Sequence, residues 1–147
     1  MSIRAYRHDD LPAILDIYTH SKLDELKFEE KSFTLLPLEK DQVRFSELME
    51  SDIYLFQAQD RIFGYAAMCG DEIRALFVYP QCRGKGVGKK LLEFLLPLIK
   101  GSPCLYVASS NHPAKGLYQR YGFSVTETFE TTYNQVPVTA QKMVLKK

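Results

Sequence analysis

Residues 81–89 read Gln-Cys-Arg-Gly-Lys-Gly-Val-Gly-Lys, and they separate two segments of different character. The preceding segment, residues 72–78, is predicted as a strand. The apolar residues that follow recur at helical spacing, namely Leu91, Leu92, Leu95 and Ile99. Glycines between a strand and a helix permit tight turns, and amides at a helix N-terminus attract anions. The stretch therefore predicts a phosphate or pyrophosphate site built from backbone amides.

The glycine spacing excludes two common phosphate loops. A nucleoside-triphosphate loop needs Gly-x-x-x-x-Gly-Lys followed by Ser or Thr, but Gly88 and Lys89 are followed by a second lysine, and Arg83 stands where the first glycine should be. A dinucleotide loop needs Gly-x-Gly-x-x-Gly, and the run of Gly84, Gly86 and Gly88 is one residue too short. A glycine-rich turn that only caps a helix remains an alternative.

Strands and helices alternate irregularly along the rest of the chain. The predicted strands cover residues 2–7, 53–58, 62–68, 72–78, 105–108, 123–133 and 136–145. Four helices are predicted: one that begins at Asp9 or Asp10, one over residues 39–50, one that follows the glycine loop, and one over residues 111–121. Residues 27–38 are predicted as a loop or broken helix. This mixed order implies an α/β sheet with a meander and a crossover helix.

Composition limits the classes of function. A chain of 147 residues fits a single domain, residues 1–147, and a hydrophobic content of 46% supports a real core. The formal net charge of +1 creates no field that favours nucleic acid or an acidic membrane. Three cysteines, an odd count without paired spacing, and three scattered histidines match neither a disulfide framework nor a zinc site. We expect a reduced cytoplasmic protein without a metal, a nucleic-acid partner or a membrane partner.

A second motif lies downstream of the glycine loop. The strand containing Tyr106 is followed by Asn111, by Tyr118 on the next predicted helix, and by a closing Tyr121-Gly122-Phe123. Together, the two motifs resemble the hallmarks of the GNAT (Gcn5-related) N-acetyltransferase family, in its small, bacterial-type, single-domain form. The resemblance covers essentially the whole chain, although residues 22–50 and the last hairpin match only in outline.

The resemblance implies both a fold and a cofactor. The expected fold is the GNAT acyl-CoA N-acyltransferase fold of the α/β class, whose mixed, mostly antiparallel sheet has about seven strands with a splayed parallel pair and about four flanking helices. The pantetheine arm of acetyl-CoA lies between the splayed strands and satisfies their unpaired backbone groups. The positions implied for this backbone are Leu76, Phe77 and Val78.

The resemblance also assigns the rest of the cofactor site. The backbone around the glycine loop is expected to hold the pyrophosphate, through Arg83, Gly84, Lys85, Gly86, Val87, Gly88 and Lys89. Asn111 is expected to contact the cofactor, while its place before a helix also suits an N-cap, and one amide group can do both.

Two residues are implied as catalytic. Tyr118 would be the general acid near the thioester sulfur, although its helical stripe also suits a core position. Glu72 would be the general base; the alternatives are an exposed carboxylate at a strand end and a base that acts through relayed water. Many relatives place a glutamate in the strand before the asparagine, where this chain has Tyr106. The backbone N–H of Val78 is the candidate donor to the oxyanion, and Cys82 is interpreted as a bystander.

The expected function is transfer of an acetyl group from acetyl-CoA directly to a primary amine of a small molecule, a protein N-terminus or a lysine. The alternative is a non-catalytic acyl-CoA sensor on the same fold. The acceptor is expected to enter between residues 22–38 and the hairpin of Tyr133, where acidic residues either attract an amine or form a solvated face, namely Asp24, Glu25, Glu29 and Glu30. A monomer or a homodimer is expected.

Overall fold

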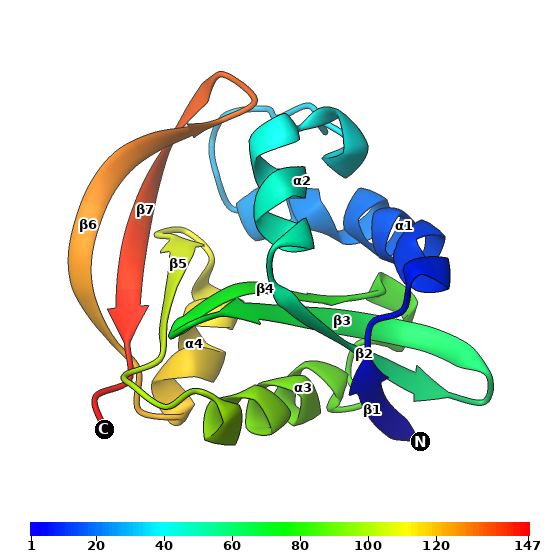
Figure 1. The fold of residues 1–147 in the computed structure, drawn as a ribbon. Helices are drawn as coiled ribbons and strands as arrows, with labels where there is room; N and C mark the ends of the chain where they lie inside the picture. The colour runs from blue at the N-terminus through cyan, green and yellow to red at the C-terminus, as the bar shows by residue number, and fades with distance from the viewer.

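The computed structural model describes residues 1–147, and its seven strands form one sheet in the order β1-β2-β3-β4-β5-β7-β6 (Figure 1). The strands are β1 (Ser2–Ala5), β2 (Asp52–Ala58), β3 (Arg61–Cys69), β4 (Glu72–Val78), β5 (Cys104–Ala108), β6 (Ser124–Tyr133) and β7 (Val136–Val144). The helices are α1 (Leu11–Ser21), α2 (Gln42–Met49), α3 (Val87–Leu95) and α4 (His112–Arg120). All neighbouring strands are antiparallel except β4 and β5. The mixed sheet with one parallel pair and four flanking helices is therefore confirmed.

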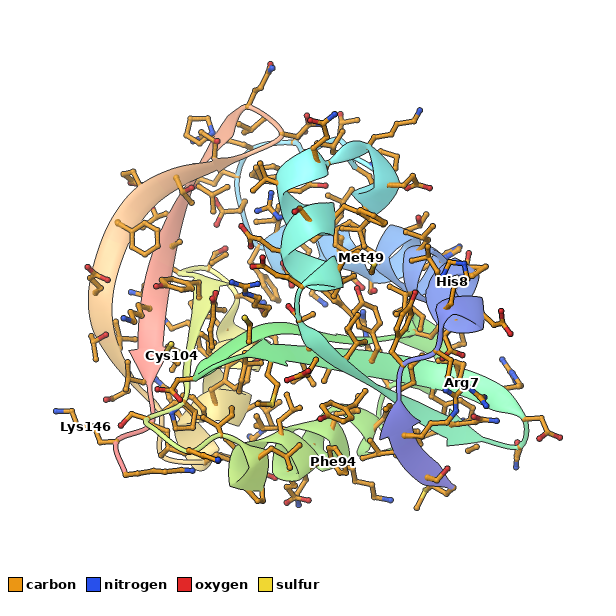
Figure 2. The ribbon with its side chains drawn as sticks, viewed as in Figure 1. Arg7, His8, Met49, Phe94, Cys104 and Lys146 are labelled. Atoms are coloured by element: carbon orange, nitrogen blue, oxygen red, sulfur yellow. The ribbon has the colours of Figure 1, made fainter.

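Two apolar cores cover the two faces of the central sheet. Helices α1 and α2 lie on one face and α3 and α4 on the other (Figure 1). On the α1 side, Ile14 and Ile17 pack with Tyr65 of β3. On the α3 side, Leu91 and Leu92 are fully buried, and Phe94 lies against β2, with its ring centroid 5.0 Å from that of Tyr54 (Figure 2). None of the helices combines the length and hydropathy that crossing a membrane requires.

Two helix boundaries differ from the predicted ones for local reasons. The helix predicted from residue 39 begins at Gln42, because Asp41 caps it by accepting a hydrogen bond from the N–H of Arg44 at 3.3 Å. A short 3-10 turn, η3 (Leu38–Lys40), precedes it. The helix predicted through Ile99 ends as an α-helix at Leu95 and continues as a 3-10 turn that contains a proline, η5 (Leu96–Leu98).

A β-bulge at Arg74 changes which face of β4 points into each core. The register runs from Ala67↔Ala75 to Met68↔Ile73, so Arg74 is the extra residue in β4. Ile73 accordingly belongs to the α3-side core, whereas Ala75 belongs to the α1-side core. The Arg74 guanidinium ties the bulge to two carboxylates, at 2.5 Å from Glu50 and 3.2 Å from Glu72.

The carboxylate of Asp10 fastens the first strand to the first helix. It accepts a two-point contact from the Arg4 guanidinium, at 2.8 and 2.9 Å, and a third hydrogen bond from the backbone N–H of Arg7 at 2.7 Å. Asp9 or Asp10 was expected to cap α1; Asp10 occupies the N-cap position, but its side chain makes no capping bond to that helix. The hydrogen bond from Arg4 is the main reason that the pKa of Asp10 is lowered.

We predict that Asp10→Asn lowers the free energy of unfolding by about 2 kcal/mol at pH 7, because it leaves the Arg4 guanidinium without its charged partner. A lowered pKa means that the stabilisation by Asp10 is present above its ordinary pKa of about 3.9 and is lost as the pH falls through the folded value. Urea unfolding of both proteins between pH 7 and pH 3 should show a constant difference that shrinks only below about pH 4. Exposed Asp9→Asn is the control, and an equal loss in both variants would contradict this role.

Candidate functional site

Strands β4 and β5 pair at one point and then separate. Their only register pair is Glu72↔Cys104, and the N–H of Cys104 donates to the carbonyl of Asp71 at 2.9 Å (Figure 2 labels Cys104). Beyond this point β5 pairs only with β7, and β4 only with β3. Residues 76–78 of β4 and 106–108 of β5 then line a cavity of about 700 Å³, called the main cavity below. The expected splayed pair is therefore present.

Backbone groups of β4 face this gap. The N–H of Tyr79 donates to the carbonyl of Phe63 at 2.9 Å, so the odd-numbered positions here bond toward β3. Because amides alternate between the two edges of a strand, those of Leu76 and Val78 are directed toward the gap. Phe77 contributes its buried ring to the cavity wall instead. Unpaired amides next to an apolar cavity fit a ligand with amide groups of its own, such as a pantetheine arm.

The glycine loop forms one end of the main cavity. Gly84 and Gly86 both have φ of 78°, a conformation that glycine adopts without strain. Gly86 is the N-cap of α3 and supplies no side-chain partner, so the first amides of this helix remain free. Arg83, Gly84, Gly86, Val87 and Gly88 line the cavity. This cradle of free amides at a helix N-terminus fits a diphosphate.

The basic side chains of the loop do not all point into the cavity. Lys85 and Lys89 are not among the residues that line it, and the Lys85 ammonium lies 5.5 Å from the ring centroid of Phe63. The Arg83 guanidinium forms an ion pair with Asp24 at 2.5 Å. The backbone N–H groups of the loop are therefore better placed to bind an anion than the ammonium groups of Lys85 and Lys89.

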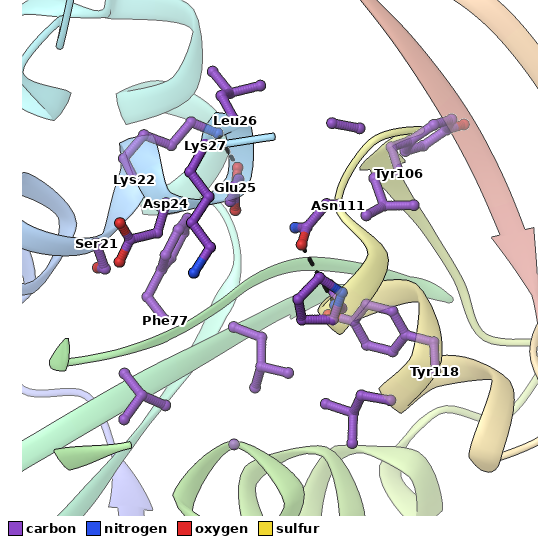
Figure 3. Close-up of a pocket in the computed structure, with 18 of the residues that line it drawn as sticks. Ser21, Lys22, Asp24, Glu25, Leu26, Lys27, Phe77, Tyr106, Asn111 and Tyr118 are labelled. Carbon is purple, nitrogen blue, oxygen red and sulfur yellow. Dashed lines mark hydrogen bonds and ion pairs between the residues drawn. The ribbon is translucent and has the colours of Figure 1, made fainter. Parts of the chain in front are cut away.

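Asn111 and Tyr118 line the main cavity on the side that faces Lys22 and Glu25 (Figure 3). Asn111 is the N-cap of α4, because its Oδ1 accepts a hydrogen bond from the N–H of Ala114 at 3.4 Å. Its side-chain NH₂ group donates to no protein atom and remains available to a ligand. The hydroxyl of Tyr118 makes no hydrogen bond within the protein and is open to the cavity. Burial, with a smaller contribution from the charge of Glu25, raises the pKa of Tyr118 well above its usual range.

A second cavity, of about 270 Å³, meets the main cavity beside Tyr118. It lies toward α1 and α2 and is lined by Tyr18, Leu38 and Leu48, among others. Glu72 lines only this second cavity, where its carboxylate is bound to the Arg74 guanidinium. The residues that line both cavities define the junction between them, namely Lys22, Glu25, Arg44, Leu76, Phe77, Tyr106 and Tyr118.

Lys22 and Glu25 belong to a short 3-10 turn, η2 (Lys22–Leu26), that follows α1. Their side chains form an ion pair of 2.7 Å at the junction. From the sequence, Glu25 is only one of several acidic residues expected near the acceptor, and Lys22 carries no signal of its own. Their i,i+3 spacing in the sequence is compatible with an ion pair. The spacing does not show that this pair lies at the junction of the two cavities. No group of three or more His, Cys, Asp or Glu side chains is placed to hold a metal ion.

The Acetyltransferase (GNAT) domain model matches residues 50–125, which include the whole of β4, the glycine loop and α4. The chain belongs to the GNAT acetyltransferase family. As a member of it, this acetyltransferase is an acetyl-CoA-dependent enzyme that acts on an amine, as the sequence resemblance implied.

Individual relatives agree with this assignment. Peptidyl-lysine N-acetyltransferase YjaB of Escherichia coli K12 is 32% identical over 132 residues, which cover 86% of this chain and 84% of that protein. A GCN5-related N-acetyltransferase structure from Rhodopseudomonas palustris has a TM-score of 0.80 at 18% identity and covers 99% of this chain and 95% of its own. The structure of the putative acetyltransferase yncA from Salmonella typhimurium with acetyl-CoA has a TM-score of 0.74 at 23% identity, over 99% and 93% of the two chains. The two structures support the fold.

For this acetyltransferase, we predict that Gly86→Glu abolishes binding of acetyl-CoA while the protein stays folded. No atom lies within 4 Å of a Cβ built at Gly86, so the side chain fits, but it adds negative charge where the diphosphate is expected. The left-handed φ costs about 1–2 kcal/mol. In thermal unfolding, acetyl-CoA at about 100 times its dissociation constant should stabilise the wild type by about 2.7 kcal/mol and the variant not at all.

Gly70→Glu is the matched control for this prediction. Gly70 also has a positive φ, of 60°, and open space around its Cβ, but it lies in the turn between β3 and β4 and does not line the main cavity. It should show the same loss of stability as Gly86→Glu and a normal shift with acetyl-CoA. A normal shift in Gly86→Glu would refute the loop assignment.

Proposed function

We propose that the enzyme acetylates the side-chain amine of a lysine in a protein or peptide, at the junction of the two cavities. The observation that carries the proposal is that the Tyr118 hydroxyl and the Glu25 carboxylate border the same junction. One can donate a proton to a leaving thiolate, and the other can accept a proton from the acceptor's ammonium and so free the amine for attack. The name of the E. coli relative, a peptidyl-lysine N-acetyltransferase, supports lysine as the acceptor.

The proposed cofactor site uses mainly the backbone. Bound acetyl-CoA supplies an activated thioester and a thiolate leaving group. The amides of residues 83–89 hold the diphosphate, and those of Leu76 and Val78 pair with the pantetheine arm. The N–H of Val78 is also the proposed donor to the developing oxyanion. Asn111 donates from its free NH₂ group while its oxygen caps α4.

Tyr118 is the proposed general acid. Because burial raises its pKa, the hydroxyl stays protonated at neutral pH and is available as a donor. The same shift makes complete proton transfer to a thiolate with a pKa of about 8.5 unfavourable. The hydroxyl therefore first stabilises the thiolate through a hydrogen bond and completes the transfer as the thiol leaves the site.

Two carboxylates can serve the acceptor. A lysine amine with a pKa of about 10.4 loses its proton at pH 7 at a cost of about 4–5 kcal/mol, so a base has to assist. We assign Glu25 the direct role because it borders both cavities, and Glu72 a role through relayed water because it lines only the second. The second cavity is polar enough and large enough to hold water.

We also propose that residues 1–147 act as one N-acetyltransferase domain, in the cytoplasm, as a monomer or homodimer. The formal net charge of +1 supports a function without a nucleic-acid or membrane partner. Gel filtration and cell fractionation measure these properties. No observation favours the alternative of a non-catalytic acyl-CoA sensor. That alternative would be supported if the protein bound acetyl-CoA but acetylated no lysine peptide.

We predict that Tyr118→Phe lowers the single-turnover rate with a lysine peptide by about 10²- to 10⁴-fold. The ring still packs against Phe123, so stability and acetyl-CoA affinity should change little. The loss should appear in both kcat and kcat/KM, as expected for an interaction made in the transition state. Single-turnover rates are the measurement, because slow product release can hide the chemical step. Wild-type rates in the variant would return Tyr118 to a purely structural role.

We predict that Glu25→Gln lowers kcat/KM for a lysine peptide by about 10²- to 10³-fold and Glu72→Gln by about tenfold. Both substitutions preserve size and remove the charge that accepts the proton. Steady-state kinetics on both variants, with acetyl-CoA affinity measured alongside, separate a catalytic effect from one on cofactor binding. A larger loss in Glu72→Gln would reverse the two assignments.

A further inference from the structure

The side chain of Lys22 is turned into the protein, with 12% of its surface exposed. A buried ammonium needs compensating partners, and Lys22 has four. Its Nζ lies 2.7 Å from Oε2 of Glu25 and 5.4 Å from the ring centroid of Tyr133. The ring centroids of Tyr18 and Phe77 are each 5.9 Å away. Three rings and a carboxylate thus form a cage around a lysine ammonium of the enzyme itself.

This cage lies where an acceptor amine has to arrive. Lys22, Glu25 and Phe77 all border the junction of the two cavities. Phe77 stands between Leu76 and Val78, whose amides face the gap that fits the pantetheine arm. Figure 3 shows Lys22 and Glu25 across the cavity from Tyr118. The Lys22 amine therefore lies beside the proposed base, across the cavity from the proposed acid.

We propose that Lys22 is an autoacetylation site, modified by the acetyl-CoA bound to the same molecule. The inference rests on the proposed function, because it uses the same reaction centre. Glu25 takes a proton from the Lys22 ammonium, and the freed Nζ attacks the thioester carbonyl. The new C–N bond forms as the C–S bond breaks, and the electron pair leaves with the CoA thiolate, which takes up a proton through Tyr118. The nitrogen gives up a second proton as the amide forms, and this proton replaces the one that Tyr118 gave to the thiolate. The products are Nε-acetyl-Lys22, free CoA and the proton held by Glu25.

Two features favour this reaction over modification of other lysines. The amine is tethered beside its base, so no association step is needed, and tethered reactants gain large effective concentrations. The buried Tyr18 hydroxyl has no hydrogen-bond partner in the protein and is available to the carbonyl of an acetylated lysine in the cage. Lys27 also lines the main cavity, but its ammonium lies over the ring of Phe28 and has no carboxylate partner.

The test is incubation of the purified wild-type enzyme with acetyl-CoA and no acceptor, followed by intact mass measurement and peptide mapping. We expect one acetyl group per molecule, on Lys22, with a rate per molecule that stays constant when the enzyme is diluted. Lys27 is the internal reference and should remain unmodified over the same time. Lys22→Arg keeps a cation for Glu25 and should lose the single acetyl group, with its fold checked by thermal unfolding. Gly86→Glu measures any acetylation that does not depend on a bound cofactor.

The outcomes separate this inference from the function on which it rests. The same preparation is assayed in parallel with a lysine peptide. Unmodified Lys22 in an enzyme that acetylates the peptide would overturn the autoacetylation site and leave the proposed function standing. A rate per molecule that rises with enzyme concentration would overturn reaction within one molecule, as would equal modification of Lys22 in Gly86→Glu. If neither Lys22 nor any lysine peptide is acetylated, both proposals fail.

Discussion

The structure depends on backbone hydrogen bonds that β4 and β5 do not make with each other. Buried amide groups are costly when unpaired, so two adjacent parallel strands normally close their ladder. Here the ladder stops after Glu72 and Cys104, and the sheet gives up further pairing in the middle of its core. A ligand with its own amides can restore those bonds. At the proposed site, the pantetheine arm takes the place of the missing strand pairing, so cofactor binding completes the sheet instead of occupying a pocket beside it.

The bulge at Arg74 gives a physical reason for the separation. It lies two residues beyond the last paired position of β4, and a bulge bends its strand and increases the local twist. The ion pair with Glu50, the C-cap residue of α2, holds Arg74 toward that helix, and Glu72 on the same strand binds the same guanidinium. Meanwhile β5 is held on its other edge by β7 along its whole length. Each strand follows its remaining partner, and the main cavity opens between them.

The sequence was informative where function depends on local chemistry. The closely spaced glycines Gly84 and Gly86 indicate a turn with positive φ angles just before a helix. A cradle of backbone amides between a strand and a helix was therefore predictable. The same holds for the strand, asparagine and helix that bring Tyr118 to the cavity. The Arg74 bulge carries no glycine or other local mark, and the Lys22 cage joins α1, β4 and β6, which are far apart in the chain. Such features arise only when distant elements pack.

The packing also agrees with the proposed direct transfer, which forms no acyl-enzyme. Cys82 comes just before the loop but is 3% exposed and packs in the α3-side core, so its thiol does not reach the junction. Ser21 lines the main cavity, but its hydroxyl donates to the carbonyl of Ile17 within α1. Tyr118 stays protonated because burial raises its pKa. None of these three groups is placed to act as a nucleophile, which agrees with the proposed attack by an amine, whether it comes from an acceptor or from Lys22. In the proposed mechanism, the side chains around it move protons and hold a cation, and the amine attacks the thioester directly.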